Sequence, residues 1–293
     1  MSTTETASPR YANIETWSAL EIVDGIVEGQ FTAIAAVQAA RAPIAEAIER
    51  GAERLQAGGR LIYLGAGTSG RIATQDASEL PPTFSWPYER AISLMAGGAS
   101  AFTQAAEGAE DSQEQAVAAL DEIGINANDV VLGLAASGRT PYAIAGLTHA
   151  RAKGALTIGI YNNAGGQIGA VCDIPVLLDT GPEFLAGSTR MKAGTAQKAA
   201  LNCISTGVMM RLGFVYRGLM VEMRASNVKL RDRAIRIVAQ ITDADMETAG
   251  AALETSEGSI KLAVLMIERG IDRSTAELLL DRAKGNLRTA LDG

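Results

Sequence analysis

Short apolar runs alternate with helix-period stretches over most of the chain. The continuous apolar runs are 60–64, 91–95, 129–135, 156–161 and 174–178. A short run of this kind that ends at a turn is typical of a parallel strand buried on both faces. Helical periodicity fills most of the intervals, at 111–123, 141–153 and 188–212. The alternation predicts an α/β fold with a five-stranded, doubly wound parallel sheet flanked by helices.

The two ends of the chain lack the strand pattern. A Ser18/Glu21 capping box opens helix-period sequence that continues to Leu55 as two helices, before Gly58 and Gly59. Beyond residue 228 only helices are expected, at 230–238, 259–268 and 274–283, the last opened by a second capping box, Ser274 with Glu277. We therefore expect an N-terminal helical segment (1–50), a sheet domain (51–227) and a small C-terminal helical module (228–293).

The triplet Ser-Gly-Arg follows two of the expected strands, at 69–71 and 137–139. Ligands of parallel sheets bind at the carboxyl ends of strands, where backbone N–H groups and a helix start favour an anion. The hydroxyls that could hold a phosphate there are Thr68, Ser69, Ser137 and Thr140. The glycine spacing at 65, 67 and 70 also fits a dinucleotide fingerprint, although the acidic residue expected later is not evident. The third possibility is that these glycines only shape the turns and bind no ligand.

Acidic residues gather at two places that could supply acid–base chemistry. Glu79 lies just before Leu80-Pro81-Pro82. A proline disfavours helical backbone angles at the residue before it, so a helix begun at Thr68 should end near Glu79. A carboxyl at a helix C-terminus meets the negative end of the dipole, which favours the protonated acid. The second cluster is Glu107, Glu110 and Asp111. Taken singly, any of these residues could be an ordinary surface acid.

Besides the two Ser-Gly-Arg turns, a basic segment, 187–194, is expected to begin the long helix and carries Ser188 and Arg190. It is either a further anion contact at a helix start or an N-cap flanked by solvated basic residues.

Composition narrows the range of partners. The chain has 26 basic and 33 acidic residues, a net charge of −7, which argues against nucleic acid or an anionic membrane as the main partner. Two cysteines (Cys172 and Cys203) and a single histidine (His149) do not suggest a disulfide scaffold or a metal site. Neither a signal peptide nor a membrane span is apparent, so a cytoplasmic protein is expected.

Taken together, the motifs resemble those of the N-acetylmuramic acid 6-phosphate etherases. The stretches that carry the resemblance are 64–71, 76–84, 108–111, 135–142 and 187–198. The chain departs from the family pattern at Ser8, at Leu80 and over 72–75. The resemblance implies a sugar isomerase (SIS) domain over 51–227, a homodimer with active sites near the subunit interface, and no cofactor. It also implies cleavage of the lactyl ether of N-acetylmuramic acid 6-phosphate by elimination and hydration, giving N-acetylglucosamine 6-phosphate and D-lactate.

The resemblance places the two acid–base glutamates of the family on Glu79 and Glu110. Turn chemistry and the resemblance together assign phosphate contact to Ser69, Ser137 and Thr140, with Thr68 and Ser188 as further candidates. Arg71, Arg139 and Arg190 could bind phosphate or the lactyl carboxylate, or form interface ion pairs. A non-catalytic sugar-phosphate-sensing regulator and an aldose–ketose isomerase on the same fold are the alternatives. The paired carboxylates favour an enzyme over a regulator.

Overall fold

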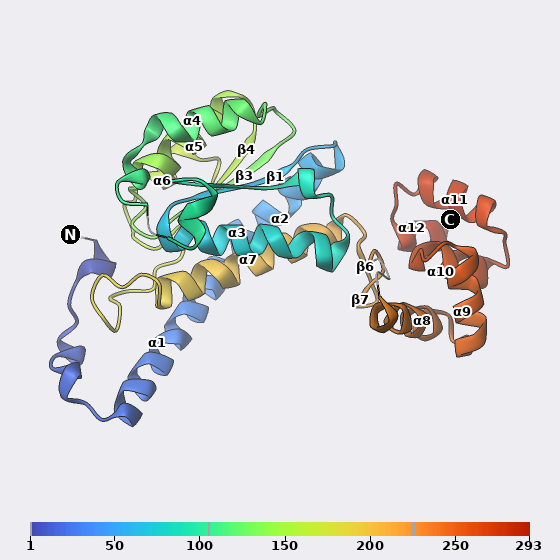
Figure 1. The fold of residues 1–293 in the computed structure, drawn as a ribbon, viewed down its shortest axis with the longest axis horizontal. Helices are drawn as coiled ribbons and strands as arrows, with labels where there is room; N and C mark the ends of the chain where they lie inside the picture. Colours follow the sequence, from blue (N-terminus) through green and yellow to red (C-terminus); the bar gives the residue numbers. More distant parts are fainter. Residues whose placement is uncertain (1, 105, 224–226) are drawn as a thin grey trace. The chain divides into compact units, whose positions relative to one another are not determined.

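The computed structural model describes residues 2–104, 106–223 and 227–293, and the chain divides into two compact units (Figure 1). The first unit comprises residues 1–79 and 88–205 and carries a five-stranded sheet. The second comprises residues 80–87 and 206–293 and is mainly helical. The three-part division expected from the sequence, with boundaries at 50/51 and 227/228, stays a prediction.

All five strands of the sheet are parallel, in the order β2-β1-β3-β4-β5. The strands are β1 (Leu61–Gly65), β2 (Ala91–Met95), β3 (Val130–Ala135), β4 (Leu156–Tyr161) and β5 (Ile174–Leu177). Every residue of β1, β3 and β4 is buried, which explains why their sequences are apolar without alternation. The predicted fold class, a five-stranded parallel sheet flanked by helices, is confirmed.

Helices cover both faces of the sheet (Figure 1). On one face lie α4 (Gln113–Glu122), α5 (Pro141–Ala152) and α6 (Ile168–Val171), which pack with the sheet around a continuous apolar core. On the other lie α2 (Arg41–Gln56), α3 (Gly67–Phe84) and α7 (Lys192–Arg211). The remaining long helix of this unit is α1 (Ala19–Ala39), which begins with the predicted capping box: the Glu21 N–H donates to Ser18 Oγ, and the Ser18 N–H donates to Glu21 Oε2 at 2.7 Å.

Short 3-10 helices connect several of these elements. They are η1 (Thr3–Glu5), η2 (Pro9–Tyr11), η3 (Ile14–Thr16), η4 (Tyr88–Arg90), η5 (Ala99–Phe102) and η6 (Ala109–Asp111).

Two predicted helix boundaries were wrong. The helix that starts after β1 does not end near Glu79 but continues through Pro81 and Pro82 to Phe84. The two prolines remove the N–H groups that would bond the carbonyls of Ala77 and Ser78, so the last turn of α3 forms without these two hydrogen bonds. The long helix α7 starts at Lys192 and not at Ser188, because residues 187–191 form turns.

The second unit is a small helical module with its own core. The described residues of this unit form a hairpin of two short strands, β6 (Val215–Tyr216) and β7 (Leu219–Met220). They also form the helices α8 (Val228–Thr242), α9 (Met246–Thr255), α10 (Ile260–Arg269), α11 (Arg273–Arg282) and α12 (Leu287–Asp292). The three helices expected here correspond to α8, α10 and α11. The capping box at Ser274 was wrong: Asp272 Oδ1 accepts the Thr275 N–H at 2.8 Å and starts α11 earlier.

Candidate active site

The sheet order reverses between β1 and β3, since β2 lies on the outer side of β1 while β3, β4 and β5 continue on its inner side. In open α/β sheets this switch point, at the carboxyl ends of the strands, is where ligands bind. Both Ser-Gly-Arg turns lie here, because α3 begins just after β1 and α5 just after β3. The structure thus brings the four predicted hydroxyl residues to one edge: Thr68 and Ser69 at the start of α3, and Ser137 and Thr140 before α5.

The first turn is shaped by glycine. A Cβ added to Gly70 would lie 2.7 Å from the carbonyl oxygen of Gly65, and one added to Gly65 would lie 2.9 Å from the Gly70 nitrogen. Gly67 has a φ of +53°, in the left-handed region that L-residues avoid. The start of α3 therefore lies backbone against backbone on the end of β1, and Ser69 is buried there.

The second turn leaves its hydroxyl groups largely free. Ser137 Oγ accepts the Arg139 N–H at 3.1 Å, and Gly138 takes a φ of +66°. Thr140 is the N-cap residue of α5, yet its side chain accepts no capping hydrogen bond, and Pro141 removes one N–H from that helix start. A hydroxyl in this position can donate to an incoming phosphate oxygen.

Glu110 shares a cavity with the first turn. The cavity has a volume of about 330 Å³ and is lined by Ala66, Gly67, Arg71, Met95, Ala96, Ala101, Ala106, Glu107, Gly108, Ala109 and Glu110. Glu110 comes from η6 in the β2–α4 connection, and its side chain is exposed toward solvent. Glu110 and part of the first turn, Gly67 and Arg71, therefore face one volume large enough for a small molecule, whereas the four predicted hydroxyl residues do not line it.

Arg71 has a role that the sequence did not indicate. Its Nε donates to the carbonyl of Phe102 at 2.9 Å, and its Nη2 donates to the carbonyl of Ala101 at 3.0 Å. The guanidinium thus ties the start of α3 to η5, which forms part of the cavity wall. Arg139 and Arg190, in contrast, are exposed, and their guanidinium groups form no hydrogen bond or ion pair with the residues that the structure describes.

Glu79 lies apart from this group. Two contacts fix the direction of α3. Thr74 Oγ1 lies 2.6 Å from Oγ of Ser93, which is in the middle of β2. The hydroxyl of Tyr63, which is in the middle of β1, donates a 2.9 Å hydrogen bond to Asp76 Oδ2. The helix therefore runs back along the strands, and Glu79 lies about 18 Å beyond Gly67 at 1.5 Å per residue. Its side chain is exposed. A single chain does not bring Glu79 and Glu110 to one cavity.

The start of α7 is already occupied by a carboxylate of the chain itself. Glu183, fully buried, accepts the N–H of Lys192 at 3.0 Å and the N–H of Ala193 at 2.9 Å. Burial lowers the pKa of Lys192, which the negative charge of Glu183 opposes. Ser188 lies in the turn before this helix start, so an anion there would have to use side chains or other N–H groups. Glu183 was missed because a cap supplied from a preceding loop has no fixed spacing to its helix.

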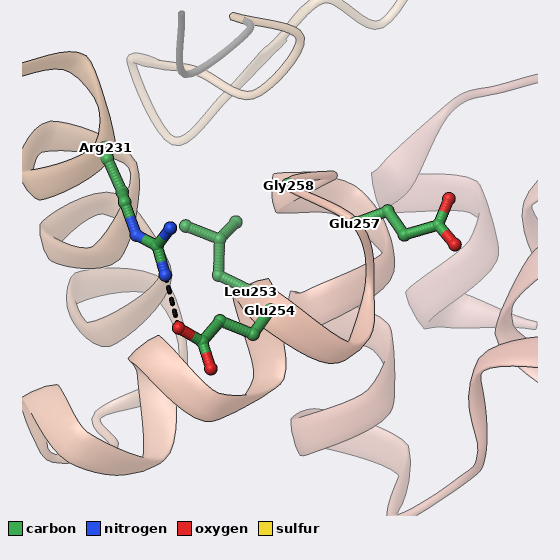
Figure 2. Close-up of a pocket in the computed structure, with 5 residues that line it drawn as sticks. All are labelled: Arg231, Leu253, Glu254, Glu257 and Gly258. Carbon is green, nitrogen blue, oxygen red and sulfur yellow. Dashed lines mark hydrogen bonds and ion pairs between the residues drawn. The ribbon is translucent and has the colours of Figure 1, made fainter. Parts of the chain in front are cut away.

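The helical module has a larger cavity, of about 460 Å³, but its charges are satisfied internally (Figure 2). Arg231 forms an ion pair with Glu254, and Glu257 pairs with Arg273. Among the described residues that line this cavity, no cation is therefore left unpaired for a phosphate. Among the described residues, no cluster of His, Cys, Asp or Glu could hold a metal ion.

Sequence comparison connects this geometry to a known family. The chain is 47% identical to an N-acetylmuramic acid 6-phosphate etherase of Deinococcus radiodurans over 98% of its length and 94% of that protein. It is 49% identical to an etherase of the same name from Streptomyces avermitilis, over 99% of this chain and 93% of the other. The chain belongs to the N-acetylmuramic acid 6-phosphate etherase family.

Two further matches concern the sheet domain of this etherase-family chain. A family model described as the glucokinase regulatory protein N-terminal SIS domain matches residues 43–151. A phosphoheptose isomerase from Francisella tularensis superimposes with a TM-score of 0.51 at 18% identity, covering 66% of this chain and all of the other, which shows a shared fold. In the part of the etherase-family chain that the structure describes, no helix is long and apolar enough to cross a bilayer.

Proposed function

We propose that this protein cleaves the D-lactyl ether of N-acetylmuramic acid 6-phosphate, producing N-acetylglucosamine 6-phosphate and D-lactate. The observation that carries the proposal is the near full-length match to etherases of this name. The hydroxyl-rich turns at the β1/β3 switch point support it, because they suit a phosphate monoester.

The elimination step needs two proton transfers, and the whole reaction includes no redox step. In the open-chain sugar, the aldehyde acidifies the proton on carbon 2, so a carboxylate can remove it. The electron pair left on carbon 2 forms a double bond to carbon 3 as the carbon 3–oxygen bond breaks, and the departing lactate oxygen takes a proton from a carboxylic acid. Water then adds across the double bond, its oxygen to carbon 3 and a proton to carbon 2. Each acid–base group of this kind typically contributes about 10²–10⁴-fold in rate.

We assign the acid that protonates the lactate oxygen to Glu79 and the base at carbon 2 to Glu110. We assign phosphate contact to Ser69, Ser137 and Thr140, with Thr68 and Ser188 as further candidates. Arg139 follows Ser137 and precedes Thr140, and its guanidinium has no partner among the described residues, so it suits the phosphate or the lactyl carboxylate. Arg71 would act on the substrate while also holding η5 in place.

A second copy of the chain is part of the proposal. Glu79 lies far from the Glu110 cavity within one chain, so both carboxylates can reach one substrate only if Glu79 is supplied by a partner subunit. We therefore propose a homodimer in which each active site combines Glu110 and the phosphate turns of one subunit with Glu79 of the other. A cytoplasmic location accords with two free cysteines, one of them exposed.

The direct test is to incubate the purified protein with N-acetylmuramic acid 6-phosphate and measure D-lactate. We expect stoichiometric lactate, a loss of about 10²–10⁴-fold in kcat for Glu79→Gln, and substrate binding largely retained. Conversion of the sugar to a ketose without lactate would show an isomerase instead. Binding without any turnover would show a sensor.

The shared site is tested by mixing two inactive variants. Glu79→Gln and Glu110→Gln subunits, unfolded and refolded together, should form heterodimers in which one of the two sites keeps both glutamates. Random pairing should then restore about a quarter of the wild-type activity per chain. No recovery from heterodimers of verified composition would place both glutamates in the same subunit and contradict the proposed arrangement.

A further inference from the structure

Helix α1 buries its small residues and exposes its large ones. The side facing the rest of the unit carries Gly25, Gly29, Ala33 and Ala36, all buried, and only near its C-terminal end a larger buried residue, Val37. The opposite side carries Leu20, Val23, Val27, Phe31 and Ile34, which are between 48% and 72% exposed. We call these five side chains the α1 stripe. An ordinary surface helix turns its large apolar residues inward, so this arrangement indicates a missing partner.

The helix cannot correct this by rotating. A Cβ added to Gly25 would lie 2.6 Å from the ring of Phe184, and one added to Gly29 would lie 3.1 Å from the side chain of Lys192. The Phe184 ring is in turn packed against Tyr11 and Trp17. Only small residues allow α1 to lie this close, and the α1 stripe is therefore held outward.

The size of the α1 stripe points to a protein partner. Five apolar side chains that are each about half exposed or more leave a patch on the order of 500 Å², near the upper limit for a soluble monomer. A stable protein–protein contact buries about 800 Å² per partner, so the α1 stripe would form most of the apolar centre of one.

The spacing of the α1 stripe is symmetric about Val27. Leu20 and Ile34 lie seven residues to either side, and Val23 and Phe31 lie four residues to either side. A twofold axis through Val27 would place Leu20 opposite Ile34 of a second copy, Val23 opposite its Phe31, and Val27 opposite its Val27. A twofold interface requires self-complementarity of this kind.

The charges on α1 favour the same antiparallel arrangement. Glu21, Asp24 and Glu28 all lie in its first half, and the helix contains no lysine or arginine. Parallel pairing would align the three acids with their copies. With the axis at Val27, antiparallel pairing instead places Glu21 beside Ala33 and Asp24 beside Gln30 of the other helix. Glu28, next to the axis, has its charge balanced by an ion pair with Arg10 of its own chain.

We infer that the α1 stripe packs antiparallel against α1 of a second copy of this chain, with the twofold axis at Val27. The inference deepens the proposed function and rests on it, because the shared active site requires a dimer and this contact identifies a surface that forms one.

Cross-linking tests the position of the axis without disturbing the fold. In a Cys203→Ser background, Val27→Cys should form a disulfide-linked dimer under mild oxidation, since its two copies meet at the axis. Leu20→Cys should not, because its copies would lie about 21 Å apart along the helices. Thr32→Cys, exposed on another side of α1, is the matched control. Equal cross-linking of all three variants, or none at Val27, would overturn the antiparallel pairing.

Charge insertion tests the contact itself. Val27→Glu should weaken self-association by at least about 100-fold in analytical ultracentrifugation, whereas Thr32→Glu should not. Loss of both the dimer and lactate release supports the pairing and the shared site together. A Val27→Glu variant that stays dimeric and active overturns the pairing but leaves the proposed function intact. A monomeric variant that still releases lactate at the wild-type rate supports the α1 contact and contradicts the shared site.

Discussion

The first turn of α3 and the turn that carries Glu79 belong to one helix but are held in different ways. At the start, the backbone of Gly70 lies directly on the backbone of Gly65, with no space for a side chain. Near Glu79, the helix is held by the side chain of Asp76, which accepts the Tyr63 hydroxyl at 2.9 Å and the Lys198 ammonium at 2.5 Å. The start of α3, where we propose that phosphate binds, is therefore held by close backbone contact, and the Glu79 turn is held by charge and hydrogen bonds.

This difference has a structural cause. A turn that presents N–H groups to an anion needs close backbone approach, which glycine alone permits. The turn before Glu79 precedes Pro81 and Pro82, so the carbonyls of Ala77 and Ser78 lose their helical donors and the helix end is less fixed by its own hydrogen bonds. Asp76 compensates by anchoring α3 to β1 and α7 one turn before the proposed acid.

The largest expected effect is that of Gly70→Ala. The new Cβ would lie 2.7 Å from the Gly65 carbonyl oxygen, and the neighbouring atoms belong to a buried strand that cannot move aside cheaply. We expect a loss of about 3 kcal/mol in the free energy of unfolding, measured by urea denaturation.

Gly67→Ala is the matched control for Gly70→Ala. No atom lies within 4 Å of its added Cβ, but its φ is +53°, so it should lose only about 1 kcal/mol, from backbone strain. Equal losses in the two variants would show that close approach is not what holds the start of α3.

The next largest effect is expected for Asp76→Asn. The substitution leaves the ammonium of Lys198 without its carboxylate partner at a site where the Asp76 side chain is only 4% exposed. We expect a loss of about 2 kcal/mol in unfolding free energy and a fall in kcat for lactate release, with little change in KM, because Glu79 loses its anchor. Adding Lys198→Met should recover part of the stability, since the unpaired charge is then removed.

Asp129→Asn separates anchoring from general destabilisation. Asp129 is a fully buried carboxylate in the same unit, paired with Arg60 and far in sequence from Glu79. It should lose at least as much stability as Asp76→Asn while the folded protein keeps its kcat. Should both variants lose kcat in proportion to stability, Asp76 would have no specific effect on Glu79.

The sequence predicted the sheet better than it predicted these contacts. Continuous apolar runs identified all five strands. In the three central strands, β1, β3 and β4, the reason is burial on both faces, whereas the edge strands β2 and β5 are only partly buried. The sequence could not show that α3 continues past Pro81, since a proline beyond the first turn of a helix usually kinks or breaks it. Nor could it reveal the Glu183 cap of α7 or the Arg71 bonds to η5, which join residues whose spacing follows no local rule.

The same limit applies to the distance between the two proposed catalytic glutamates. Glu79 and Glu110 are close in the sequence, and motif reasoning assigned them to one reaction. Only the direction of α3 along the strands, fixed by Thr74 beside Ser93 and Asp76 beside Tyr63, shows that one chain holds them apart. The resemblance implied active sites near a subunit interface, and the geometry gives a physical reason to propose one.

The smallest expected effect is that of Tyr63→Phe, and its sign should depend on pH. At neutral pH the variant loses one buried hydrogen bond to Asp76, about 1 kcal/mol. Burial, together with the negative charge of Asp76 and the hydrogen bond to it, raises the pKa of Tyr63 well above its ordinary value. Above about pH 10 the unfolded chain releases this proton while the folded chain retains it, so wild-type stability falls by up to about 1.4 kcal/mol per pH unit.

Phenylalanine has no proton to release, so the stability curves of wild type and Tyr63→Phe should approach each other above pH 10 and cross near about pH 11. Tyr142→Phe is the control: burial alone raises the pKa of Tyr142 to about 12, and its hydroxyl bonds to none of the described residues. Tyr142→Phe should therefore lose little unfolding free energy at pH 7, yet its stability relative to wild type should rise at high pH in the same way. If the Tyr63→Phe curve instead stays parallel to wild type through this range, Tyr63 ionises as easily in the folded chain as in the unfolded one. A hydrogen-bonded, buried anchor before Glu79 would then be excluded.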